Sequence, residues 1–198
     1  MRCFLLLILV QTNIWGFSQS DSYFFKNGIC FSSIDSSLFT GEVIYEGNSN
    51  ILDYKTISYY KDGSRQYSRS FYPNNELKSF DSWNSAFSHS INYYKGMKVR
   101  NIQERRNGVL YCNSVTWYET GTVLEKGEFY LGKKIGDFTS FYKTGELLSI
   151  ISYDSTGVKL SFESFHQNGN YYQKGIYYKN GLSKVFDEWD KNGVLILN

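Results

Sequence analysis

The sequence predicts an all-β fold: an elongated single-sheet repeat array of consecutive antiparallel hairpins, with about 24 residues per unit. Three observations support this prediction. The 198-residue chain has 19% aromatic residues and 17 glycines but a single proline, which is typical of strands joined by tight turns. Glycines recur about every 12 residues, and the residues around them repeat about every 24. From about residue 39 onward there is room for about thirteen strands, which corresponds to a sheet about 60 Å long.

Residues 1–18 have the features of a secretory signal peptide. An uninterrupted apolar run, Phe4–Val10, is followed by small residues at Gly16 and Ser18, the positions that precede a cleavage site. The run is much shorter than the roughly 20 residues that a membrane-spanning helix needs. We therefore expect cleavage near Ser18/Gln19, a secreted or periplasmic bacterial protein and no transmembrane span. The alternative is that this segment forms a buried first element.

Turn signals follow, after an expected N-terminal cap and first strands at residues 19–55. Many of the recurring glycines come after Asn, Asp or Thr. Asn-Gly and Asp-Gly favour type I′ hairpin turns, in which both central residues have positive φ. The recurring glycines are Gly63, Gly96, Gly108, Gly121, Gly132, Gly145, Gly157, Gly169, Gly181 and Gly193.

The repeat array is expected to span residues 56–198. Two residues after alternate glycines the side chain is apolar, so one unit contains two strands and two turns; these positions are Val123, Leu147, Tyr171 and Leu195. A hairpin cannot bury its aromatic side chains alone, so neighbouring units must pair. At 80–92 the turn glycine is missing, and we interpret this stretch as a degenerate repeat or a loop.

Aromatic side chains precede each turn, and tyrosines often follow them directly. Because successive side chains of a strand point to opposite faces, the two sets are expected on opposite faces of the sheet. The first set includes Tyr59, Phe71, Trp117, Phe141, Tyr153, Phe165, Tyr177 and Trp189. The candidate partner-binding row is Tyr60, Tyr72, Tyr118, Tyr142 and Tyr178. Tyrosine offers a large apolar surface and a hydroxyl to a partner; the alternative is that the row only packs across strands and stabilises the sheet.

Three segments of the array, Trp117–Gly121, Phe141–Leu147 and Tyr177–Gly181, resemble the MORN repeat variant. Tyr130–Phe138 is similar to the second, glycine-rich segment of that unit. The resemblance covers about residues 56–198 and implies an elongated antiparallel sheet of hairpins. Proteins with these repeats are commonly labelled as the antitoxin of a proposed toxin–antitoxin pair. The family carries no established catalytic residues, so none are transferred to this chain.

The sequence gives little support for catalysis, metal binding or nucleic-acid binding. The net charge of +2 is too small for a nucleic-acid footprint. The chain has two histidines, His89 and His166, and no motif of a metalloprotease, a phosphate-binding loop or a serine hydrolase. We therefore expect no enzyme activity, no cofactor and no metal. Cys30 and Cys112 are candidates for a disulfide in an exported chain, and two buried free thiols are the alternative.

These observations predict an exported, non-catalytic repeat protein that serves as a protein-binding or envelope scaffold module. The expected partner is a protein or another component of the cell envelope. The chain itself is expected to be a monomer or an edge-to-edge dimer, because open sheet ends can pair between chains. One alternative function is an antitoxin or immunity protein that neutralises a toxin by direct binding. Another is an enzyme that acts on envelope polymers.

Overall fold

The computed structural model describes residues 23–49, 52–84 and 86–197, and the predicted signal peptide at 1–18 lies outside these ranges. The described residues form seventeen strands and no helix. A separate hairpin consists of β1 (Tyr23–Lys26) and β2 (Ile29–Ser32). The strands of the long sheet are β3 (Gly41–Ser49), β4 (Leu52–Lys61), β5 (Ser64–Phe71), β6 (Leu77–Trp83), β7 (Phe87–Tyr93), β8 (Val99–Arg106), β9 (Val109–Leu110), β10 (Cys112–Trp117), β11 (Val123–Tyr130), β12 (Lys133–Phe141), β13 (Leu147–Tyr153), β14 (Lys159–Phe165), β15 (Tyr171–Tyr177), β16 (Ser183–Trp189) and β17 (Leu195–Leu197).

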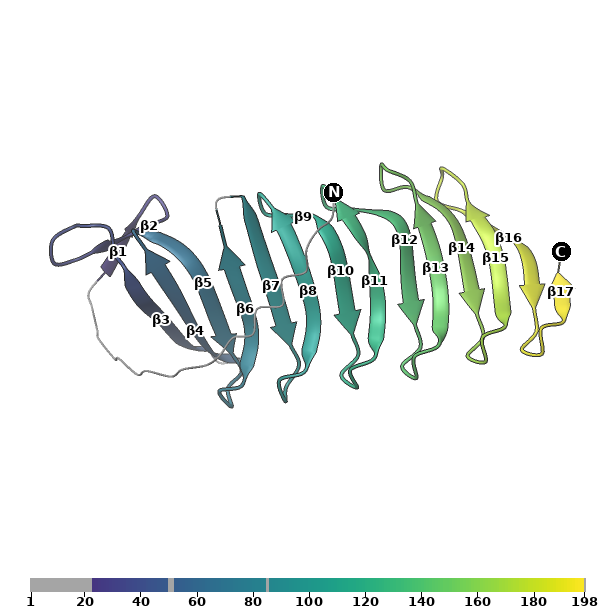
Figure 1. The fold of residues 1–198 in the computed structure, drawn as a ribbon, viewed down its shortest axis with the longest axis horizontal. Helices are drawn as coiled ribbons and strands as arrows, with labels where there is room; N and C mark the ends of the chain where they lie inside the picture. Colours follow the sequence, from purple (N-terminus) through teal and green to yellow (C-terminus); the bar gives the residue numbers. More distant parts are fainter. Residues whose placement is uncertain (1–22, 50–51, 85, 198) are drawn as a thin grey trace.

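The long sheet is a single antiparallel layer in which strands follow one another in chain order from β3 to β17 (Figure 1). Only β9 leaves this path, because it pairs with β8 beside β10. The predicted all-β array of consecutive hairpins is therefore confirmed. The sheet has fifteen strands rather than about thirteen.

The stretch at 80–92, which lacks a turn glycine, does not interrupt the sheet. It lies in β6 and β7, which pair in register from Ser79↔Asn92 to Trp83↔Ser88. The side chain of Asn84 replaces the glycine turn, since its Oδ1 accepts hydrogen bonds from the backbone N–H of Ala86 (3.2 Å) and Phe87 (2.8 Å). An Asx turn of this kind needs no glycine, so a hairpin forms where a loop was one of two expectations.

All the predicted turn glycines have positive φ, but the turns are of two kinds. Asp62-Gly63, Asn107-Gly108 and Leu131-Gly132 have positive φ at both residues, as a type I′ turn requires. At Asn168-Gly169 only the glycine does. There the N–H of Gly169 donates to the carbonyl of His166 (2.9 Å), which closes a longer turn. The type I′ expectation is thus confirmed at Asp62-Gly63 and Asn107-Gly108 and wrong at Asn168-Gly169, Asn180-Gly181 and Asn192-Gly193, because a longer loop needs only one left-handed residue.

The two faces of the sheet differ in chemistry, and the strand register defines each of them. We call one the serine face, after the row in which Thr56, Ser70, Ser79, Asn92, Asn101 and Thr116 lie side by side on β4 to β10. The other is the isoleucine face, after the adjacent row of Ile57, Arg69, Phe80, Ile91, Ile102 and Val115 on the same strands.

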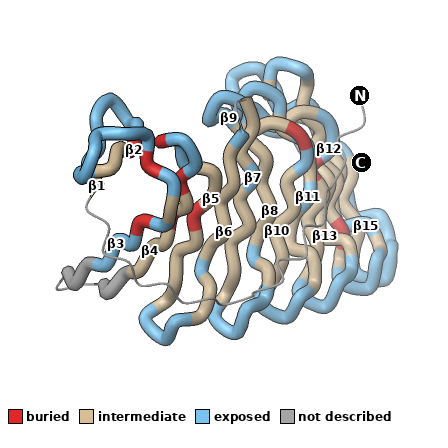
Figure 2. Tube along the Cα trace, turned by 60° about the vertical axis from the view of Figure 1, so that its left-hand side comes forward, coloured by how far each residue is buried: buried red, intermediate tan, exposed pale blue. Residues whose placement is uncertain are grey.

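The N-terminal residues form the main buried cluster of the described chain. Cys30, Phe39, Val43 and Tyr60 pack together, and Tyr23 lies against them. Figure 2 shows this buried region where β2 meets β3, β4 and β5. The cluster caps the β4–β5 turn, since Cys30 N–H donates to the Gly63 carbonyl (3.0 Å) and Gly63 N–H donates to the Phe39 carbonyl (2.8 Å). The cap lies on the serine side, because Val43 pairs with Ser58 in that face.

Apolar side chains change sides at β11. From β3 to β10 the central row of the isoleucine face is mostly apolar. On β11 to β16 the row continues on the same face, but most of its side chains are polar or charged: Lys126, Thr139, Ile150, Glu163, Lys174 and Asp187. On β12 to β14 the serine face instead carries Phe138, Ile151 and Phe162, which lie side by side. The Phe138 ring covers Gly127 of β11, where an added Cβ would lie 2.6 Å from ring atoms.

Candidate interaction face

The five tyrosines of the predicted partner-binding row do not lie in a single row. Tyr60 is only 5% exposed and belongs to the N-terminal cap. We use edge for the line along which alternate strands end. One such edge, where β5, β10 and β12 end, carries Tyr72, Tyr118 and Tyr142. Tyr178 follows β15, which ends at the opposite edge, and is 46% exposed. One strand with its turn takes about 12 residues, and successive strands run in opposite directions. Residues 24 apart therefore lie at the same edge, whereas residues 12 or 36 apart lie at opposite edges. The expectation of a single tyrosine row is therefore wrong.

Three of these tyrosines belong to a hydrogen-bond ladder that joins successive hairpins. Each hydroxyl donates to the last carbonyl of a strand in the next hairpin, about 23 residues later. The bonds are Tyr72 to Tyr93 (2.8 Å), Tyr94 to Trp117 (2.9 Å), Tyr118 to Phe141 (2.9 Å) and Tyr142 to Phe165 (2.7 Å). His166 Nε2 makes the same contact with the Trp189 carbonyl (2.9 Å). The prediction missed Tyr94 and His166, although the 24-residue spacing from Tyr118 marks both positions.

The isoleucine face is the surface of the described chain best suited to a partner. Its central row from Ile57 to Val115 is half-buried by neighbouring strands, and Ile44 at its start is 47% exposed. Within residues 23–49, 52–84 and 86–197 the sheet has no second layer on this side (Figure 2). A sheet normally buries its apolar face against another element, and the described residues leave this one uncovered.

An aromatic row extends this face along the edge where the tyrosine ladder lies. Its registered pairs are Phe71↔Leu77, Tyr93↔Val99, Trp117↔Val123, Phe141↔Leu147, Phe165↔Tyr171 and Trp189↔Leu195. Two contacts place the row on the isoleucine face. Lys126 Nζ lies 5.6 Å from the ring centre of Phe141, and Lys174 Nζ lies 3.8 Å from that of Tyr171. This apolar row therefore reaches from β5 to β17.

Most charges on the isoleucine face are matched within the chain. Arg69 pairs with Glu42 across β4 (2.8 Å), and Lys174 pairs with Glu163 (3.5 Å). His89 Nδ1 lies 3.4 Å from a Glu104 carboxylate oxygen, and the His89 side chain is 48% exposed. A partner that covers this face would meet few unpaired charges, which lowers the cost of desolvation.

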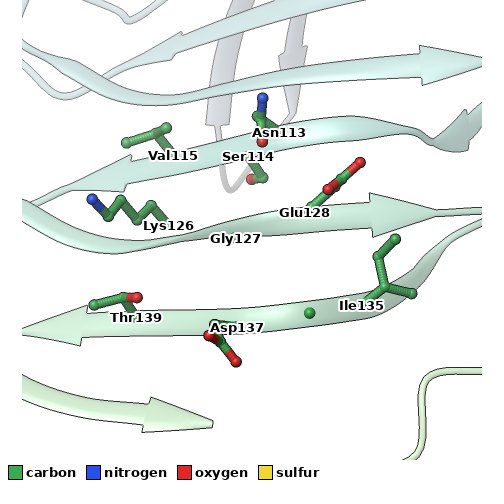
Figure 3. A pocket seen from close by; sticks show the side chains of 10 residues that line it. Asn113, Ser114, Val115, Lys126, Gly127, Glu128, Ile135, Asp137 and Thr139 are labelled. Carbon is green, nitrogen blue, oxygen red and sulfur yellow. The ribbon is translucent and has the colours of Figure 1, made fainter. Parts of the chain in front are cut away.

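A shallow depression interrupts the isoleucine face at β10 to β12 (Figure 3). It arises because Gly136 has φ 63° and β12 carries extra residues opposite Gly127, so the register shifts between Lys126 and Glu128. Polar side chains at its rim include Asn113, Lys126, Glu128, Asp137 and Thr139. Ser152 of β13 donates to Asp137 Oδ1 (2.6 Å), so this carboxylate is already hydrogen-bonded to the neighbouring strand.

Carboxylates at the turns are engaged by the backbone. Asp154 Oδ1 accepts hydrogen bonds from Thr156 Oγ1 (2.7 Å), Thr156 N (2.8 Å) and Val158 N (3.0 Å). The hydrogen bond from the Thr156 side chain and that from the Val158 backbone hold the pKa of Asp154 below its ordinary 3.8. Asp190 repeats the arrangement, and its pKa is lowered chiefly by the backbone N–H of Val194. These groups are ionised turn caps.

The described part of the chain shows neither a metal-binding group of three or more His, Cys, Asp or Glu residues nor a helix of the length and hydropathy needed to cross a membrane.

The candidate disulfide between Cys30 and Cys112 is not formed. Cys30 is a buried free thiol in the N-terminal cap, and burial raises the pKa of that thiol. Cys112 begins β10, four strand positions beyond β5 in the sheet order. At about 4.8 Å per strand the separation is about 19 Å, whereas a disulfide requires Cα atoms within about 7 Å of each other.

Comparisons with known proteins assign no family. No protein-family model matches the chain, and no curated protein matches it. Among solved structures it is similar to a mutant of S. aureus TarM in complex with fondaparinux, alpha-GlcNAc-glycerol and UDP, at 9% identity and a TM-score of 0.26, over 72% of this chain and 21% of that chain. A second TarM crystal structure has 10% identity with the same TM-score and coverage. The chain thus spans about a fifth of the TarM chains, and a likeness at this level carries no functional argument.

Proposed function

We propose that this is an exported, non-catalytic repeat protein whose sheet serves as a protein-binding or envelope scaffold module. The observation that carries the proposal is the isoleucine face, an apolar surface along β4 to β10 with no second layer among the described residues. Burying apolar surface stabilises a complex by about 25 cal/mol per Å². A partner that covers even part of this face therefore gains several kilocalories per mole before the costs of association.

The arrangement of polar groups supports binding rather than catalysis. His166 is used by the ladder at the Trp189 carbonyl, and His89 pairs with Glu104. Asp154 and Asp190 cap their own turns. A catalytic site needs a nucleophile, a base and a stabilising group that converge on one reacting atom. These histidines and carboxylates are instead spread along the array in separate contacts.

Export is the second part of the proposal and rests on residues 1–18 of the sequence. The full chain is expressed in a bacterium, the cells are fractionated, and the mass of the intact protein is measured. A periplasmic or secreted product that begins near Gln19 is expected. An uncut product in the cytosol, beginning at Met1, would contradict export.

Binding at the isoleucine face is tested by photo-crosslinking in the producing cells. A crosslinking amino acid replaces Phe80 or Ile150 on the isoleucine face, and Ser79 or Ser149 on the serine face as matched controls on the same strands. We expect the crosslinker at position 150 to form a link to a protein other than this chain, and the crosslinker at position 149 to form none. The proposal fails if Phe80 and Ile150 give no link to another protein, or if the serine positions give the same links.

A further inference from the structure

The apolar central row of the isoleucine face is confined to one part of the sheet. On β6 to β10 it reads Phe80, Ile91, Ile102 and Val115 without a charge, and Ile57 extends it to β4 beyond Arg69. From β11 onward charged side chains occupy most of the same row. The result is a bounded apolar patch, defined here as the patch of β4 to β10, with a polar rim toward the C-terminal end.

We propose that two copies of this chain pack against each other through the patch of β4 to β10, isoleucine face to isoleucine face, as a two-layer sandwich. This inference rests on the proposed function, because it names the first partner of the same face. The C-terminal part of the face, with its charges and aromatic edge row, stays open to a second, different partner.

The size of the patch fits the interface that a stable dimer needs. The patch consists of six neighbouring strands, β4, β5, β6, β7, β8 and β10, so it is six strand widths across. At about 4.8 Å per strand and about 20 Å along each strand, it presents about 600 Å² per copy. Two copies would bury about 1,200 Å² in total, which reaches the lower bound of stable, specific interfaces.

The shape of a second copy also suits the patch. Sheets that pack face to face need matching twist, and their strands then lie about 30° apart. Two copies of one sheet have the same twist by definition. A two-fold axis between β6 and β7, the middle of the patch, places each strand of the patch over a strand of the patch in the other copy. Closed two-fold dimers are the commonest oligomers.

Charge does not oppose this packing. Arg69, the one charged side chain of the central row within the patch, is already paired with Glu42 of its own chain (2.8 Å). The guanidinium also lies 5.8 Å from the ring centre of Tyr67. Two copies that meet here bring together matched ion pairs rather than like charges.

Sedimentation equilibrium of the full chain tests the dimer. The wild-type chain is expected to dimerise at micromolar concentration. Ile102→Lys with Val115→Lys changes a registered pair on the isoleucine face, and Asn101→Lys with Thr116→Lys changes the adjacent pair on the serine face. The first variant is expected to raise the dimer dissociation constant about 100-fold or more. The reason is that a two-fold dimer contains each new lysine in both copies, so four ammonium groups would have to be buried in the interface. The second is expected to change it less than about threefold.

A measurement on the unchanged chain covers the case in which the first variant fails to fold, as judged by circular dichroism. Isotope-labelled and unlabelled copies are mixed and treated with an amine crosslinker. Links between copies are expected at Lys55 and Lys126, on the isoleucine face, and not at Lys134 and Lys159, whose ammonium groups lie over Phe138 and Tyr177. A monomeric wild-type chain, or links at Lys134 and Lys159 instead, would overturn the dimer. A link from Ile150 to a different protein in cells would still support the proposed function.

Discussion

Tyr118 illustrates how a single hydroxyl joins two hairpins. Its backbone N–H closes its own turn onto the Thr122 carbonyl (2.8 Å), and its hydroxyl donates to the carbonyl of Phe141, at the end of β12 (2.9 Å). The contact spans 23 residues of sequence. A side chain that satisfies a neighbouring carbonyl in this way fixes the spacing of the hairpins, because the bond forms only when the two strand ends lie at one distance.

Removal of this hydroxyl is expected to weaken the array. Tyr118→Phe keeps the ring and deletes the bond to the Phe141 carbonyl, so the free energy of unfolding should fall by about 1 kcal/mol. Tyr178→Phe is the matched control, since Tyr178 lies at the other edge and is 46% exposed, and its effect should be close to zero. Urea unfolding followed by circular dichroism measures both. Equal losses in the two variants would show that the ladder hydroxyl has no special role.

The turn carboxylates make stability depend on pH in the acid range. The pKa of Asp154 and that of Asp190 are below the ordinary value of 3.8 in the folded chain. Each group therefore contributes its full stabilisation above pH 3.8, and the contribution is lost as the pH falls through the folded pKa. We expect the thermal midpoint to drop as the pH falls below about 4, and to drop less in the double variant Asp154→Asn, Asp190→Asn. The same pH profile in both chains would contradict this assignment.

At the scale of the hairpin, a regular β-bulge gives each unit its shape. After each long turn at the ladder edge one residue of the next strand is left unpaired, as the register shifts show. These residues are Lys78, Arg100, Leu124, Leu148, Tyr172 and Ile196. From Arg100 onward they are 24 residues apart. A bulge increases the local twist of a strand, so its repetition keeps every unit in the same geometry.

Close contact between a phenylalanine and a glycine on the neighbouring strand is a second device of the unit. Gly127→Ala is expected to lower the free energy of unfolding by about 1–3 kcal/mol, because the new Cβ would lie 2.6 Å from the Phe138 ring. Ser114→Ala, at the position that pairs with Gly127, is expected to change it by less than about 0.5 kcal/mol. Thermal unfolding of both variants distinguishes a steric cost from a general intolerance of alanine. A neutral Gly127→Ala would mean that the ring moves aside freely.

The hairpin pattern could be predicted from the sequence, whereas the faces could not. The spacing of the glycines predicts where the strands begin and end, because most turns need a residue in the left-handed conformation, as at Gly145. At residues 80–92 the sequence left a degenerate repeat and a loop as alternatives, because the Asx turn at Asn84 leaves no glycine signal. The single tyrosine row was misjudged because a step of 12 residues leads to the opposite edge of the sheet, where Tyr178 lies. Tyr60 was assigned to the exterior because the sequence does not reveal that the N-terminal cap covers it.

For the whole molecule, a single layer leaves two large faces to be accounted for. The cap at Cys30, Phe39, Val43 and Tyr60 supplies the main buried cluster of the described residues. The rest of the array is held by strand pairing, ring contacts and the tyrosine ladder. Such a sheet is stable without a second layer only if its apolar surface is limited, and the change of apolar side at β11 divides that surface between the two faces. On β4 to β10 this apolar surface lies on the isoleucine face, which no other described residues cover.

The central claim is that a partner covers the isoleucine face in the cells that produce the protein. Hydroxyl-radical footprinting tests it directly, by comparing oxidation in the producing cells with oxidation of the dilute purified chain. Phe80 and Trp117 report on the isoleucine face, and Trp83 and Phe162 report on the serine face. The account predicts that Phe80 and Trp117 are protected in cells while Trp83 and Phe162 are not. Equal oxidation of the two pairs in both settings would contradict it.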